Sequence, residues 1–131
     1  MHNIEDIEFF QREAMSDFNK VPDWISLSDI KVDFESKNSV ELIADYWSIC
    51  LQRYVDANLN FDITPILQDI FDLSLKSKSE YPIYITDGWI NEIAKFSDIN
   101  SINSLLEDYV ERKASNNFRN AVLFVSKSLK N

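Results

Sequence analysis

The chain has 131 residues, of which 45% are apolar and 13% aromatic, and its formal net charge is −9. This size and apolar content exclude a disordered chain and predict one domain, residues 1–131, that can bury a core without metals or disulfides. The acidic charge disfavours direct binding of nucleic acid or of an anionic membrane surface.

The negative charge is concentrated in the first part of the chain. Residues 1–75 hold fifteen Asp and Glu against five Lys and Arg, a net charge of −10, whereas residues 76–131 hold seven against eight, a net charge of +1. A field of one sign attracts a partner of the opposite sign. The asymmetry therefore indicates a basic partner for the first 75 residues.

Several residue types that define other classes of protein are scarce. Gly88 is the sole glycine, which favours helices over hairpins and phosphate-binding loops, although a gene rich in A and T would also be poor in glycine. Cys50 is the sole cysteine, so no intrachain disulfide can form. The acidic N-terminus is unlike a secretory signal, and the longest apolar run, Ala121–Val125, is far below the ~20 residues of a membrane span. We expect a cytoplasmic protein.

The first 35 residues contain one stretch with the pattern of a helix and one with the pattern of a strand. Asn3 and Asp6 predict the capped start of a helix, and Pro22 ends or redirects the chain. Alternating apolar and charged residues over Asp29–Glu35 are typical of a half-buried strand, for which Pro82–Thr86 is the best partner. Either both segments are extended and paired, or both are irregular.

Helical spacing dominates the rest of the chain. The second helix is expected from Ser39 to about Ala57 with Asn38 as its cap, and the third to start at Thr64-Pro65. A short helix should follow the Asp87-Gly88 turn, and two more should begin at Asn100 or Ser101 and at Asn116 or Asn117. The predicted fold is a mainly α, compact single domain of about five to six helices, with a two-stranded β element (Asp29–Glu35 and Pro82–Thr86) as an option.

The inventory of reactive side chains predicts no enzyme, no cofactor and no metal. His2 is the only histidine, which excludes Ser-His and Cys-His pairs and multi-histidine zinc sites. Cys50 shares an apolar helix face and is expected in the core. Carboxylate pairs such as Asp69 with Asp72 could hold a hard cation or hydrolyse a glycoside. With 22 acids in 131 residues, such pairs also arise by chance on solvated faces.

Aromatic residues interspersed among the acids suggest a protein-binding surface. Tight interfaces combine Trp and Tyr anchors with charges that steer the encounter. Alternation places three acids on the polar side of the segment 29–35, and two more acids on the following helix could extend that surface. The predicted partner-binding residues are Asp29, Asp33, Glu35, Glu41, Asp45, Trp24 and Tyr46.

In size, charge and helical pattern the chain resembles bacterial toxin immunity proteins of the colicin and contact-dependent growth inhibition type. The resemblance is carried by the acidic first helix, Glu5 to Asp17, and by the acids from Asp23 to Asp45; no diagnostic motif allows a family residue to be transferred. It implies one-to-one binding of a basic nuclease toxin domain, with its active or substrate-binding site occluded. The alternatives are a nucleic-acid mimic or other acidic adaptor, and a metal-dependent helical enzyme that uses a carboxylate pair.

Overall fold

The computed structural model describes residues 1–112 and 114–130. Within these ranges the chain is helical and contains no strand, which confirms the mainly α prediction. The elements are α1 (Ile4–Ser16), η1 (Leu27–Asp29), α2 (Lys37–Asp56), α3 (Thr64–Ser77), α4 (Tyr81–Ile93), η2 (Ala94–Phe96), α5 (Ile99–Glu111) and α6 (Asn116–Lys130), where η denotes a 3-10 turn.

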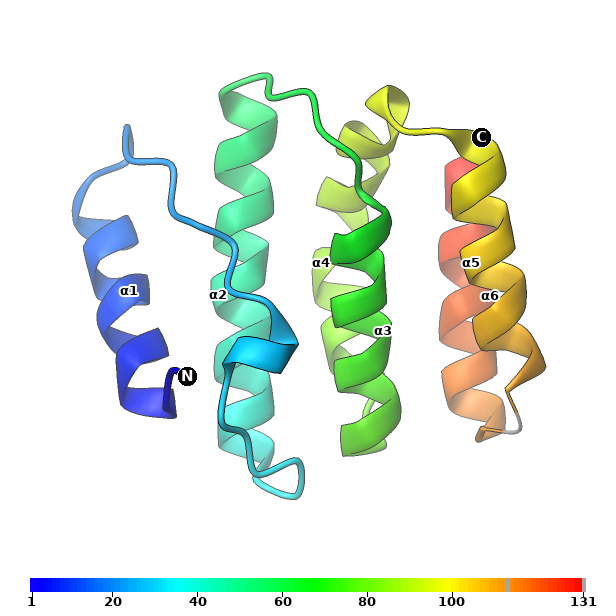
Figure 1. Ribbon diagram of the computed structural model, residues 1–131, viewed down its shortest axis with the longest axis horizontal. Helices are drawn as coiled ribbons and strands as arrows, with labels where there is room; N and C mark the ends of the chain where they lie inside the picture. Colours follow the sequence, from blue (N-terminus) through cyan, green and yellow to red (C-terminus); the bar gives the residue numbers. More distant parts are fainter. Residues whose placement is uncertain (113, 131) are drawn as a thin grey trace.

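The α-helices run side by side (Figure 1). α1 lies at one edge and packs on α2, and α5 and α6 pair at the opposite edge. Between them, α4 packs extensively on α2 and also contacts α3 and α6. Residues 17–36, which we call the strap, cross one side of α2 on their way from α1 to the start of that helix. No helix of the described residues has the length and apolar character of a membrane span.

Local capping signals explain where several helices begin. Asn3 and Asp6 form the predicted capping box of α1, in which each side chain accepts a hydrogen bond from the other residue's backbone N–H. α3 begins at Thr64 with Pro65 in its first turn, as predicted. α2 begins two residues before the predicted Ser39 because Ser36, rather than Asn38, caps it.

Two helices end in left-handed residues that are not glycine. Asn58 after α2 and Lys78 after α3 have φ values of 54° and 55°. After each, the next residue's N–H bonds a carbonyl five positions back, Leu59 to Tyr54 and Ser79 to Ser74, which is the Schellman termination. Asn58 and Lys78 therefore end these two helices in a conformation that glycine usually supplies, in a sequence that contains a single glycine.

The optional two-stranded element does not form. Pro82–Thr86 lies in the first half of α4, which continues through Asp87 and Gly88, where a turn was predicted. Pro82 occupies the first helical turn, where it costs no hydrogen bond. Apolar Ile83 and Ile90 recur at helical spacing and are buried, so tertiary packing overrides the β propensity of this segment.

The alternating segment Asp29–Glu35 is also not a strand. It contains the end of the turn η1 and a single parallel bridge between Ile30 and His2. The His2 N–H donates to the Asp29 carbonyl and the Lys31 N–H donates to the His2 carbonyl, both at 2.7 Å. Ile30 is buried while Asp29, Lys31 and Asp33 are exposed. The alternation of burial is therefore present without a sheet.

Candidate functional site

The predicted acids of the strap lie on the surface. Asp29, Asp33 and Glu35 are all exposed. The bridge to His2 also places the first turn of α1, with Glu5 and Asp6, next to Asp29. Two acidic stretches that are distant in the sequence therefore meet on one side of the molecule. No local pattern of residues indicates this pairing.

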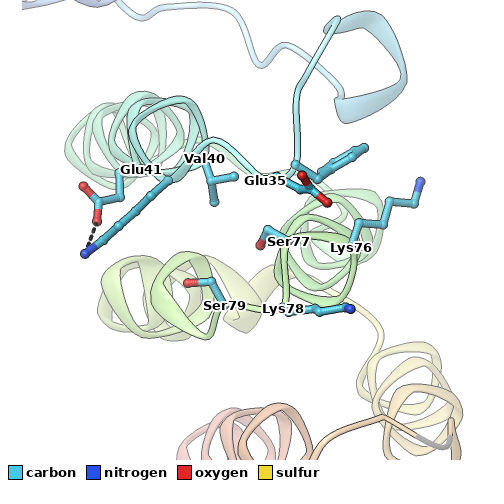
Figure 2. Close-up of a pocket in the computed structure, with 9 residues that line it drawn as sticks. Glu35, Val40, Glu41, Lys76, Ser77, Lys78 and Ser79 are labelled. Carbon is cyan, nitrogen blue, oxygen red and sulfur yellow. Dashed lines mark ion pairs between the residues drawn. The ribbon is translucent and has the colours of Figure 1, made fainter.

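A pocket of about 280 Å³ opens where the end of the strap meets α2, α3 and the start of α4 (Figure 2). Two predicted contact residues, Glu35 and Glu41, belong to its lining. The complete lining is Phe34, Glu35, Lys37, Val40, Glu41, Lys76, Ser77, Lys78 and Ser79. The pocket thus joins the acidic strap to the short α3–α4 connection.

The pocket lining contains three lysines that the sequence-based prediction did not include. Lys37 pairs with Glu41 at 3.9 Å, one turn along α2, and 86% of its side chain is exposed. Figure 2 shows the side chains of Lys76 and Lys78 extending away from Val40, while Ser77 and Ser79 lie between the helices. Glu35 takes part in no ion pair of the described residues. Lys76 and Lys78 are likewise outside the ion pairs of the described residues, so the pocket carries unpaired charges of both signs.

Asp45 holds two helices together. It is half-buried on α2 and accepts a hydrogen bond of 2.8 Å from the hydroxyl of Tyr81 at the start of α4. The pKa of Tyr81 is raised to about 12, mainly by burial and to a lesser extent by this hydrogen bond to a carboxylate. Asp45, which we predicted to contact a partner protein, is thus hydrogen-bonded to Tyr81 within the fold.

Both predicted aromatic contacts pack within the molecule. Trp24 is half-buried, stacks on Trp47 with ring centroids 5.0 Å apart, and donates from its Nε1 to Asp69 at 2.8 Å. Tyr46 is 2% exposed and donates from its hydroxyl to the Asp23 carbonyl at 2.6 Å. These side chains fix the strap, whose carboxylates then face outward.

A row of donors on α2 satisfies the backbone of the strap. Tyr54 donates to the Pro22 carbonyl at 2.9 Å and Trp47 to the Ile25 carbonyl at 2.9 Å. Arg53 is 6% exposed. Its Nη1 donates to the carbonyl of Ala14 in α1 and to those of Asp17 and Lys20 in the strap. Side-chain donors thus replace the hydrogen bonds that a helix or sheet would supply. Helical spacing places Trp47 and Tyr54 on the apolar stripe of this helix but does not identify them as donors, and it gives no indication that Arg53 is buried.

The candidate catalytic groups also serve the fold. Cys50 is fully buried, as predicted, and burial raises the pKa of its thiol to about 12. Asp69 accepts from Trp24, Ser26 and Leu27; its burial nevertheless raises its pKa. Asp72 accepts from the Tyr109 hydroxyl. In the described residues, no group of three or more His, Cys, Asp or Glu is arranged to hold a metal ion.

Comparison of the chain with protein-family models, with curated proteins and with solved structures found no match.

Proposed function

We propose that this chain is a small acidic binding protein that neutralises a basic protein partner one to one, as an immunity protein neutralises its cognate nuclease toxin. The observation that carries the proposal is the uncompensated charge of residues 1–75. Of their fifteen acids, four take part in ion pairs of the described residues: Asp6, Glu13, Glu41 and Asp72. The others leave a field that speeds encounter with a cationic surface.

The proposed contact surface is the outer side of the strap. Asp29, Asp33 and Glu35 are exposed there, and Glu41 extends the surface across the pocket. Asp33 also accepts from the Glu35 N–H at 3.0 Å, which fixes the turn that presents Glu35. The backbone of the strap is anchored by α2, so its carboxylates are held in place before a partner arrives. Such preorganisation lowers the entropic cost of association.

The test is co-purification with a basic nuclease toxin domain encoded next to this chain, and protection of cells that express that domain. Binding should weaken as ionic strength rises, because steered association is screened by salt. Charge reversal at Asp29 and Glu35, both to Lys, should weaken binding at least about tenfold, the loss of about 1.4 kcal/mol. Neither carboxylate accepts a hydrogen bond within the described residues, so the fold should be kept.

The matched control changes the same number of charges elsewhere. Glu107 and Glu111 are exposed on α5, and their reversal to Lys alters the net charge equally. The control should bind within about twofold of the wild type at physiological salt. If both double variants lost affinity for the partner equally, the effect would come from net charge and not from the strap surface. Failure of the wild-type chain to bind or to protect would refute the function itself.

A further inference from the structure

A second pocket lies between α1, the strap and α2. It opens where the strap leaves α1 and crosses to α2 (Figure 1), and its volume is about 250 Å³. The lining is Phe10, Glu13, Lys20, Pro22, Asp23, Ile25 and Tyr46. Pockets that hold drug-sized ligands measure about 300–1,000 Å³. This pocket therefore suits a single side chain rather than a whole small molecule.

Apolar and aromatic groups make up most of this lining. Phe10 and Ile25 are half-buried, and Tyr46 and Pro22 are buried. The ring centroids of Phe10 and Tyr46 lie 6.4 Å apart. The Tyr46 hydroxyl is already engaged, because it donates to the Asp23 carbonyl. The pocket thus presents hydrocarbon surface against which an aliphatic stem can pack.

The charged part of the lining is acidic, with two carboxylates and one ammonium group, a net charge of −1. Lys20 pairs with Glu13 at 3.2 Å, so the chain itself already holds one cation at this pocket. Asp23 is exposed and takes part in no ion pair of the described residues. The hydrogen bonds from Tyr46 and Cys50 reach its backbone carbonyl, not its carboxylate. An unpaired, exposed carboxylate beside apolar surface favours a cation that has an apolar stem.

Arginine fits these features better than lysine does. The stem of an arginine side chain packs along apolar surface, and its planar guanidinium stacks on aromatic rings. The guanidinium also presents its N–H donors in a fixed fork that pairs a carboxylate in bidentate geometry. A lysine ammonium is a point charge without this planar match.

The wall that the strap contributes is held in place before a ligand arrives. Side-chain donors of α2 bond the backbone carbonyls of Lys20, Pro22 and Asp23. The backbone that carries the unpaired carboxylate is therefore fixed from inside the fold, while the carboxylate itself stays exposed. A preorganised site of this kind lowers the entropic cost of binding.

We propose that this pocket receives an arginine side chain of the basic partner, with the stem against Phe10 and Ile25 and the guanidinium at the Asp23 carboxylate. The guanidinium also competes with Lys20 for Glu13. The inference rests on the proposed function for the identity of the partner, whereas affinity for arginine is a property of the pocket itself. The partner's contact surface then extends from the outer side of the strap to the gap between the strap and α1.

The test is a titration of the isotope-labelled full chain with N-acetyl-arginine amide up to about 50 mM, followed by the NMR chemical shifts of the backbone amides. The shifts should saturate with a millimolar dissociation constant and should be largest for the residues that line the pocket. N-acetyl-citrulline amide is the matched ligand, because it has the shape of the arginine probe without the charge. It should give no saturable shifts.

Two substitutions should move the affinity for the probe in opposite directions. Asp23→Asn should raise the dissociation constant at least about threefold, as expected for the loss of an exposed ion pair. Lys20→Met should lower it about twofold, because Glu13 is then released to the probe. Both side chains are exposed, and the fold uses their backbone carbonyls, so both variants should fold.

The control variants make the same changes of charge outside the pocket. Glu107→Gln removes one exposed carboxylate from α5, and Lys31→Met removes one exposed ammonium group from the strap. Each should change the dissociation constant of the probe by less than the matching pocket variant does. Equal effects of pocket and control variants would overturn the proposal, because binding would then follow net charge.

The absence of saturable shifts in the wild-type chain would also overturn the proposal. Its failure is separate from that of the proposed function. A chain that binds and neutralises a toxin domain but does not bind the arginine probe refutes the pocket alone. A chain that binds the probe at this pocket but neutralises no toxin domain refutes the function alone.

Discussion

Arg53 provides a direct test of how the strap is held. Its Nη1 donates to the carbonyls of Ala14, Asp17 and Lys20 at 3.0, 3.1 and 3.1 Å. The side chain is almost fully buried and no carboxylate lies within ion-pair distance of it among the described residues. The guanidinium therefore caps the C-terminal end of α1, where a cation is favoured by the helix dipole. Arg53→Met keeps an unbranched apolar stem and removes every donor.

The magnitude follows from the three acceptors. A hydrogen bond to a charged group contributes about 1.5–3 kcal/mol. Asp17 and Lys20 are exposed, so water can replace the guanidinium at their carbonyls, whereas Ala14 is fully buried. We expect Arg53→Met to lower the free energy of unfolding by about 3–5 kcal/mol, a large share of the 5–15 kcal/mol typical of a domain.

The assay is urea unfolding followed by far-ultraviolet circular dichroism and by the fluorescence of the tryptophans, two of which lie at the strap. Arg53→Lys is the matched control, because it keeps the charge and three N–H donors on one nitrogen but ends one bond short of the position of Nη1. It should lose about half as much. A loss below about 1 kcal/mol for Arg53→Met would show that the strap is held by apolar packing instead.

Two further substitutions test local strain and burial. Lys78→Gly should raise the free energy of unfolding by about 1 kcal/mol, because glycine adopts φ 55° without the steric cost that lysine bears, whereas Lys78→Ala should give no gain in the same urea assay. Burial raises the pKa of Asp87 above its unfolded value of about 3.9, so its contribution to stability is present at acid pH and is lost as pH rises through the folded pKa. Asp87→Asn should therefore be more stable than the wild type by about 1–3 kcal/mol at pH 7 in dilute solution, with the difference shrinking below about pH 4; a difference independent of pH would contradict this.

Local signals in the sequence were sufficient for most helices. The Asn3–Asp6 box and the Thr64-Pro65 start act within one helical turn, so a window of a few residues contains the information that fixes them. The wide apolar stripe of α2 likewise predicted a buried helix, and its Cys50 and Trp47 are fully buried. Burial of one face is encoded by spacing alone.

Features that depend on distant residues could not be predicted in this way. Pro82–Thr86 is rich in β-branched and aromatic residues, yet it is helical because its apolar face packs against α2. Tyr46 and Trp24 were assigned to a binding surface because sequence gives residue type but not the acceptor that each N–H or O–H reaches. Their acceptors, the Asp23 carbonyl and Asp69, are 23 and 45 residues away.

The way the strap is attached explains how the chain tolerates its charge asymmetry. α2 holds the strap through backbone carbonyls, with hydroxyl and indole donors and one guanidinium. Of the strap's carboxylates, Asp17 and Asp33 accept only from a backbone N–H two residues on, and those of Asp29 and Glu35 make no hydrogen bond within the described residues. Had these acids served stability, they would be expected in ion pairs with nearby lysines. Instead Asp29 and Glu35 stay unpaired although Lys31 and Lys37 are close in sequence. Asp29 and Glu35 carry charge that repels the neighbouring acids and makes no contact inside the fold, and this is the physical ground for the external contact that we propose.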